Sequence, residues 1–414
     1  MVPVGPDPTA AIVLERLRAL PAGARLLSAL DGVRGVHLVG GAVRDLLSGV
    51  VPREFDVVVV GDGVAVARVL AERLGGDVVR VHEPFGTATV EAPGGALLDV
   101  ARARTETYAR PGALPEVEPA ASVAEDLGRR DFTLNAIAVG LSADVAGALT
   151  AVDGTLEDLH AGRLRVLHDA SFVDDPTRLL RMVRYAARLG YVVEPGTEAL
   201  ARAAFAAGAP ETAGVARIAR ELMLLLREPD PDAALALLAD LAGDGLAPLR
   251  IDIPLRRRAL SVLPAGEDAV PVTLAALLHG GDEGEVRAWL EAAHVPTPGP
   301  VLAAATGSDE LAEAMRSAGA PSALHALLAR RTVPEIALAG ALGAEDEARA
   351  WFGGLRDVRL TIGAEDLLRA GVPQGRELGE RLRAALAAKL DGVATTPDEE
   401  LAAALGDGGL SDRR

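Results

Sequence analysis

Two carboxylates spaced two residues apart stand at the start of an apolar run in segment 53–60. Glu54 and Asp56 precede four valines, and because successive side chains of a strand alternate between its faces, both acids project from one face. Two carboxylates on a strand suit a divalent cation, and the alternative is an ordinary solvated strand end. Asp99 follows a second apolar run, so acids at the ends of neighbouring strands predict a two-metal site.

Two further groups contain residue types that bind phosphate. Gly40 and Gly41 follow an apolar run and precede Arg44, so the backbone can approach a ligand and the next helix offers free N–H groups. Arg130 and Asp131 precede another apolar stretch, where we expect them to open a helix that carries a buried asparagine. The alternatives are a plain strand–turn–helix connection and a capped helix with incidental surface charge.

Arginines recur after an acidic helix start. The acids and the proline at 174–176 predict a helix N-terminus. The following arginines are spaced by three, three and four residues, which aligns them along one helix face. They are Arg178, Arg181, Arg184 and Arg188. Such a stripe is stable when acids pair with it or when it receives an anion, and the sequence leaves both readings open.

The elements that must position these residues change in kind near residue 150. Helical spacing in the first thirty residues and at 64–74, with short β-branched runs at 36–39, 55–60, 77–82 and 87–91, predicts a mixed α/β domain over residues 1–145. From about residue 155 the chain is rich in Ala, Leu and Arg, which predicts an all-helical extension. Segment 102–128, with three prolines, is expected to be a long irregular loop, and such loops are usually functional.

Composition limits the class of protein. The chain has 414 residues, enough for two to four domains, and a formal net charge of −17. No apolar run approaches the roughly 20 residues of a membrane helix, and the absence of cysteine excludes a disulfide partner and thiolate metal sites. The first residues lack a secretory pattern, so a cytoplasmic location is expected. Lys389 is the only lysine, so nearly all positive charge is arginine, which suits forked contacts with phosphate and bases.

Taken together, the ordered motifs resemble those of the class II, bacterial-type tRNA nucleotidyltransferase and poly(A) polymerase family. The motifs are GGAVRD at 40–45, the strand acids at 54–56, RRDFTLNA at 129–136 and DDPTRLLR at 174–181. The resemblance implies an α+β fold, with a polymerase-β-like head followed by an all-helical neck, body and tail. It places the catalytic head at 1–145, the neck that binds base and RNA at 146–230, and the tRNA-binding body and tail at 231–414.

The resemblance also implies roles at the catalytic end. Glu54 and Asp56 would bind Mg²⁺, and Asp99 would be a third ligand or a base. Metal would lower the pKa of the RNA terminal hydroxyl and neutralise the leaving pyrophosphate. The expected nucleotide-binding residues are Gly40, Gly41 and Arg44 for the triphosphate, Arg130 and Asp131 for phosphate and ribose, and Arg181 and Arg184 for phosphate or a stacked base.

Asp175 and Arg178 are implied to read the base. Adenine and cytosine each present an amine donor beside a ring-nitrogen acceptor. A carboxylate accepts from the amine and a guanidinium donates to the ring nitrogen, so side chains at i and i+3 of a helix can serve as a protein template. Guanine and uracil present the reverse pattern and would leave charges unpaired.

The implied reaction is addition of C and A to the tRNA 3′ end from CTP and ATP. The alternatives are an A-adding enzyme or poly(A) polymerase with the same site, and a non-catalytic RNA-binding homologue, because Glu54 stands where the family has Asp. Segment 102–128 resembles the family's flexible loop, which favours CCA or A addition over CC addition. His279 lacks an adjacent Asp, so we expect no His-Asp hydrolase activity and no hydrolase domain.

Overall fold

The computed structural model describes residues 7–243 and 245–406. Contacts divide the chain into two compact units, Met1–Gly245 and Leu246–Arg414. The first unit carries the sheet and every sequence motif discussed above, and the second is built of helices. A sheet followed by helices is the α+β class that the sequence predicts. The expected subdivision at residues 145 and 230 stays a prediction.

A seven-stranded mixed sheet forms the framework of the first unit. Its strand order is β3-β4-β5-β2-β1-β8-β9, and only β2 and β5 are parallel neighbours. The strands are β1 (Val36–Val39), β2 (Phe55–Val59), β3 (Asp77–His82), β4 (Thr87–Ala92), β5 (Ala96–Arg102), β8 (Ile137–Gly140) and β9 (Leu149–Ala151). Four of them, β1 to β4, lie where the short β-branched runs predict strands. Because β9 pairs with β8, the β-structure extends beyond the expected limit at residue 145.

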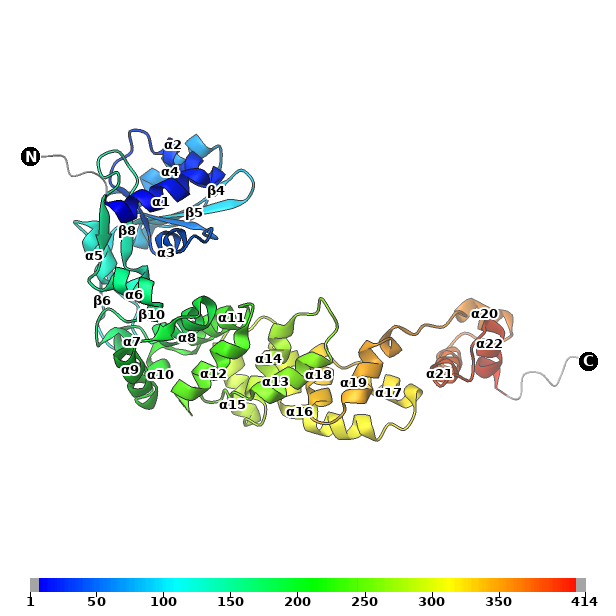
Figure 1. Cartoon of the computed structure of the whole chain (residues 1–414). Coiled ribbons are helices and arrows are strands. Elements are labelled where there is room, and N and C mark those ends of the chain that lie inside the picture. Colours follow the sequence, from blue (N-terminus) through cyan, green and yellow to red (C-terminus); the bar gives the residue numbers. More distant parts are fainter. Residues whose placement is uncertain (1–6, 244, 407–414) are drawn as a thin grey trace, which may run out of the picture. The chain divides into compact units, whose positions relative to one another are not determined.

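The two faces of this sheet are covered unequally. One face packs the larger apolar core against four helices. These are α1 (Pro8–Ala19), α2 (Pro21–Ala29), α3 (Gly41–Leu47) and α4 (Gly63–Leu74). Three of them, α1, α2 and α4, lie together in Figure 1. The other face, which includes Val58, packs a smaller cluster with α5 (Val123–Gly128). Alternation along β2 places Asp56 on the same face as Val58, so the acid lies on the less covered face.

Segment 102–128 is not the irregular loop that its prolines suggest. It forms a hairpin of β6 (Arg104–Thr107) and β7 (Glu116–Pro119), followed by α5. The proline at 119 is the last residue of its strand, where the missing N–H is tolerated. The expected loop is therefore corrected to an ordered hairpin.

The prediction of an apolar helix after Asp131 is also wrong. The 3-10 turn η2 (Thr133–Asn135) leads directly into β8. Asn135 is buried, and its amide bridges Arg44 and Asp131. A buried asparagine needs hydrogen-bond partners, and these tertiary partners are available in the turn.

Helices complete the first unit around α8. They are α6 (Thr155–Ala161), α7 (Ser171–Asp174), α8 (Thr177–Leu189), α9 (Pro195–Ala206), α10 (Ala209–Ala213), α11 (Val215–Leu226) and α12 (Pro231–Ala242). Helix α8 begins after Pro176, as predicted, and packs against α11 and α12. The extension is not purely helical, because β10 (Arg163–Leu164) and β11 (Val192–Val193) pair in parallel.

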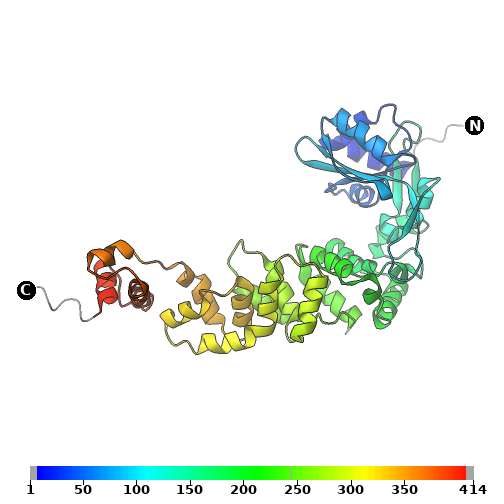
Figure 2. The same cartoon turned by 180° about the vertical axis from the view of Figure 1, so that it is seen from behind.

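The second unit consists of helices, the 3-10 turn η3 (Leu355–Asp357) and the segments that connect them (Figure 2). The helices are α13 (Ile253–Ser261), α14 (Ala269–Leu278), α15 (Glu283–Ala292), α16 (Pro298–Arg316), α17 (Pro321–Leu328), α18 (Val333–Ala341), α19 (Glu345–Phe352), α20 (Ala364–Arg369), α21 (Arg376–Leu390) and α22 (Pro397–Leu405). Within it, Lys389 binds the fully buried Glu400 at 2.6 Å. Within 7–243 and 245–406, no helix has the length and apolar character needed to cross a membrane.

Candidate functional site

A large cavity of the first unit is lined by ten of the twelve predicted site residues, and Gly40 and Asp99 are not among its lining residues. Its volume is about 770 Å³. Its arginines are Arg44, Arg53, Arg104, Arg129, Arg130, Arg178, Arg181, Arg184, Arg188 and Arg227. Its acids are Asp45, Glu54, Asp56, Glu106, Asp131, Asp175 and Glu228. The cavity thus carries an excess of positive charge in a chain whose net charge is −17, so it suits an anionic ligand.

The paired carboxylates lie where β2 enters the sheet. Asp56 faces Asp99 across the parallel β2–β5 register, and Glu54 directly precedes β2. Burial, and then the charges of Glu54 and Asp99, raise the pKa of Asp56 to about 6, while Arg130 opposes the rise. These negative charges repel one another, so the group gains from a cation.

Glu54 and Asp56 make no hydrogen bond or ion pair with any residue that the structure describes. Asp99 differs, because it lies in the middle of β5 and accepts a 2.6 Å hydrogen bond from the Thr89 hydroxyl. Among the described residues, no three His, Asp or Glu side chains converge closely enough to hold a metal. The expected arrangement of three acids at strand ends is therefore not present, and Glu54 and Asp56 are the available ligands.

The glycine turn is shaped by close packing. Gly40 has φ +65°, which favours glycine, and a Cβ there would lie 2.8 Å from Arg130 Nη1 and displace the end of that side chain. Arg44 follows on α3 and is 3% exposed. It donates to Asn135 Oδ1 at 2.9 Å and to Asp45 Oδ1 at 2.7 Å. These bonds fix Arg44 at the cavity wall.

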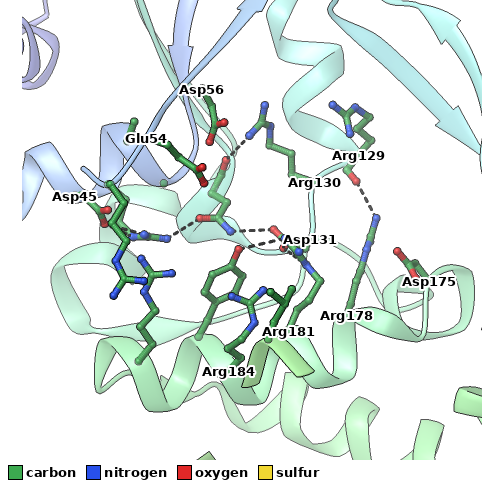
Figure 3. A pocket seen from close by; sticks show the side chains of 18 of the residues that line it. Asp45, Glu54, Asp56, Arg129, Arg130, Asp131, Asp175, Arg178, Arg181 and Arg184 are labelled. Atoms are coloured by element: carbon green, nitrogen blue, oxygen red, sulfur yellow. Dashed lines mark hydrogen bonds and ion pairs between the residues drawn. The ribbon is translucent and has the colours of Figure 1, made fainter. Parts of the chain in front are cut away.

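Asp131 has both carboxylate oxygens occupied. Oδ1 accepts from the Phe132 N–H and from the Asn135 amide, and Oδ2 accepts from Arg181 at 2.6 and 2.9 Å (Figure 3). Burial alone would raise the pKa of Asp131, but the Arg181 charge and these hydrogen bonds lower it. Asp131 therefore stays ionised and orients Arg181.

Arg130 and Arg129 share a different acid. Arg130 pairs with the fully buried Asp126 at 3.0 Å, and Arg129 pairs with it at 2.7 Å. The Nε atom of Arg130 is buried and has no hydrogen-bond partner among the described residues. The Arg130 charge also lowers the pKa of Asp56, so this guanidinium lies close enough to the paired carboxylates to act on them.

Two of the four arginines of the α8 stripe pair with acids. Arg181 reaches Asp131 (Figure 3) and Glu221. Arg184 reaches Glu221 at 3.2 Å and Glu228 at 3.6 Å. Arg188 has no hydrogen bond or ion pair with the described residues. Of the two readings that the spacing allowed, pairing with acids applies to Arg181 and Arg184.

The predicted base-reading residues both line the cavity (Figure 3). Arg178 is held by its donations to Ser171 Oγ at 2.7 Å and to the Arg129 carbonyl at 2.9 Å. Asp175 Oδ1 accepts from Thr177 and, at 2.7 Å, from Arg217. Asp175 Oδ2 accepts no hydrogen bond from the described residues. A fixed guanidinium therefore lies beside a carboxylate with a free acceptor.

Sequence reasoning missed several residues of this site. Arg217 and Glu221 come from α11, Glu228 follows it, and Tyr108 follows β6. The residues on and after α11 carry no local signal, because only packing of α11 against α8 brings them to the arginine stripe. A sequence signal for Tyr108 exists, because Arg104, Glu106 and Tyr108 alternate as on one face of a strand.

The comparisons with known proteins agree with this geometry. Residues 36–165 match the family described as poly A polymerase head domain. A CC-adding tRNA nucleotidyltransferase of Deinococcus radiodurans is 34% identical over 372 residues, which cover 88% of this chain and 87% of that protein. The chain belongs to the tRNA nucleotidyltransferase family.

Other members of the tRNA nucleotidyltransferase family have different stated activities. An A-adding tRNA nucleotidyltransferase of Geobacter sulfurreducens is 35% identical over 88% of this chain, but the chain spans only 44% of that protein's length. The structure of the Thermotoga maritima CCA-adding enzyme complexed with tRNA matches with a TM-score of 0.77 and 28% identity. That match covers 95% of this chain and 98% of the other.

Nucleotidyltransferases generally use divalent metal ions, and the residues of this member fit one. Glu54 and Asp56 are crowded carboxylates without hydrogen-bond or ion-pair partners in the described chain, and oxygen ligands of this kind suit a hard divalent cation. The raised pKa of Asp56 shows the electrostatic cost that a bound cation would relieve.

Proposed function

We propose that this protein adds C and A nucleotides to the 3′ end of tRNA, using CTP, ATP and Mg²⁺. One observation carries the proposal: the unpaired acids Glu54 and Asp56 and the base-reading candidates Asp175 and Arg178 line the same cavity. A carboxylate pair that can hold metal and a pair that can read a base are the two parts a nucleotidyltransferase without a nucleic-acid template needs.

Glu54 and Asp56 would hold the metal. When bound, Mg²⁺ would lower the pKa of the RNA hydroxyl and stabilise charge on the leaving pyrophosphate. Arg44 and Arg130 would contact the triphosphate, with Gly40 leaving room for Arg130. Asp131 would act by orienting Arg181 rather than by touching the ribose, since its two oxygens are already engaged.

Asp175 and Arg178 would select the base. The free Oδ2 of Asp175 would accept from the exocyclic amine of cytosine or adenine, and Arg178 would donate to the adjacent ring nitrogen. Ser171 and the Arg129 carbonyl fix the guanidinium, so it cannot turn away from a base that presents a donor instead of an acceptor. Guanine or uracil would leave both charged groups without partners in the cavity.

A second candidate is addition of A alone, because the Geobacter relative that matches 88% of this chain is named A-adding. A primer assay separates the two. The enzyme is incubated with Mg²⁺ and with CTP alone, ATP alone or both nucleotides together, on tRNA lacking CCA, tRNA ending in CC, or an unstructured RNA.

We expect tRNA lacking CCA to gain two C and one A. Growth of only the CC-ended tRNA, with ATP, would establish A addition instead. Extension of unstructured RNA with A alone would establish a poly(A) polymerase and overturn both candidates. Absence of incorporation on every primer would support the non-catalytic RNA-binding alternative.

A further inference from the structure

The hairpin that follows β5 carries three alternating side chains into the cavity. Arg104, Glu106 and Tyr108 all line it. Glu106 Oε1 accepts from Arg104 and Arg129, each at 2.9 Å, and Glu106 Oε2 accepts from the Tyr108 hydroxyl at 3.2 Å. Tyr108 is thus anchored at its hydroxyl by a carboxylate that two arginines hold in place.

The Tyr108 ring differs from the other two aromatic rings of the cavity. Tyr185 is approached by the guanidinium carbons of Arg44, Arg181 and Arg184, at 6.0, 5.5 and 5.0 Å from its ring centroid. Phe85 has Arg104 at 5.1 Å and the His82 ring at 4.7 Å. Tyr108 lines the cavity but makes no ring stacking or cation–π contact with the described residues.

Tyr108 also lies near the residues proposed to read the base. The charges of Arg178 and Asp175 both act on its hydroxyl. Burial is the largest cause that raises the pKa of Tyr108 to about 12. The phenol therefore stays neutral at physiological pH and keeps its proton for Glu106.

We propose that Tyr108 is the stacking platform for the base of the incoming nucleotide. The inference rests on the proposed function, because it places the base beside Asp175 and Arg178. An aromatic face binds every base through its π-surface, so Tyr108 supplies affinity for both CTP and ATP, while Asp175 and Arg178 supply the choice.

The test measures nucleotide binding and turnover separately. Tyr108→Leu removes the π-face and keeps an apolar side chain, and Tyr108→Phe keeps the ring but loses the hydroxyl. Tyr191→Ala, a tyrosine outside this cavity, is the matched control. CTP and ATP binding is measured by calorimetry with Mg²⁺ and no RNA, and KM and kcat are measured with tRNA primer.

We expect Tyr108→Leu to weaken binding of both nucleotides by about 5- to 100-fold, the range for loss of one stacked base, with kcat changed less than threefold. Tyr108→Phe should stay within about threefold of the wild type. Wild-type nucleotide affinity in Tyr108→Leu would overturn the inference. A rise in the KM for tRNA alone would also overturn it, because the ring would then contact the primer.

The direct binding measurement keeps the two proposals distinguishable. If the wild type binds CTP and ATP but transfers neither, the proposed function fails while the stacking role can still be scored. If the wild type transfers nucleotides and Tyr108→Leu binds them normally, only the stacking role fails. Thermal unfolding of each variant identifies a loss of affinity caused by misfolding, and in that case Tyr108→Met, which also lacks an aromatic ring, replaces Tyr108→Leu in the comparison.

Discussion

Asp56 on β2 and Asp99 on β5 face each other directly across the one parallel pair of the sheet. Parallel register places both side chains on the same face, so the two acids repel each other on the side where the cavity opens. Thr89 holds Asp99 through its hydroxyl, whereas Asp56 has no hydrogen-bond or ion-pair partner among the described residues. The electrostatic cost therefore concentrates on Asp56.

Replacing Asp56 with Asn should make the protein more stable but inactive. The pKa of Asp56 is raised by burial from 3.8 to about 6, so the folded state binds its proton more tightly than the unfolded state. Its contribution to the free energy of unfolding is therefore lost as pH rises through 6. At pH 7.5 in EDTA we expect Asp56→Asn to be more stable by up to about 3 kcal/mol. Urea unfolding at pH 7.5 and at pH 3.5 checks this, and an equal difference at both would contradict it. Activity should be lost.

Nucleotide incorporation should depend on pH through the same group. Asp56 must be ionised to hold a cation, and burial beside Glu54 and Asp99 raises its pKa to about 6. At low, subsaturating Mg²⁺ the rate should therefore rise about tenfold per pH unit below 6 and level off above 7. Saturating Mg²⁺ should shift the midpoint to lower pH, because metal competes with the proton. If the midpoint of the pH profile did not shift with the Mg²⁺ concentration, Asp56 would be excluded as the titrating ligand.

Glu54 is expected to support catalysis although its side chain is one methylene longer than Asp. It precedes β2 rather than lying within it, so the backbone there can absorb the extra length. We expect Glu54→Asp to change kcat by less than about tenfold and Glu54→Gln to lower it by at least a hundredfold. A near-zero wild-type rate that Glu54→Asp restores by orders of magnitude would show a non-catalytic protein.

Arg178 should govern base choice more than chemistry. Arg178→Ala should retain measurable incorporation but allow UTP and GTP within about tenfold of CTP, because the cavity no longer penalises the reversed donor pattern. Arg178→Lys keeps the charge without the planar fork and is the matched control. Competition assays with all four nucleotides provide the measurement, and an unchanged preference in Arg178→Ala would refute the template role.

Removing Arg181 should destabilise the first unit. Arg181→Met leaves Asp131 buried without its cation, which costs about 3–5 kcal/mol. Arg188→Met is the matched control on the same helix, because Arg188 makes no ion pair with described residues, and it should have little effect. The double variant Arg181→Met/Asp131→Asn should recover most of the loss. Scanning calorimetry, which can resolve the two units, provides the measurement, and equal effects of Arg181→Met and Arg188→Met would contradict the prediction.

Local sequence was sufficient where short-range periodicity decides the structure. Strands β1 to β4 and the start of α8 after Pro176 follow from alternation, helical spacing and proline chemistry. The same local reasoning failed at 102–128, where two prolines lie in the connection between the hairpin strands and a third ends β7. It failed again after Asp131, where the partners of Asn135 lie on distant segments.

The sequence by itself determined which residue types are available and how they are spaced: two acids on a strand, glycines before an arginine, and four arginines along a helix. Only the tertiary structure decided their partners. It assigned Arg181 to Asp131, Arg184 to Glu221 and Glu228, and Asp175 to Arg217. The physical reason is that charge pairing depends on distances of a few ångströms between segments far apart in the chain, which no local pattern encodes.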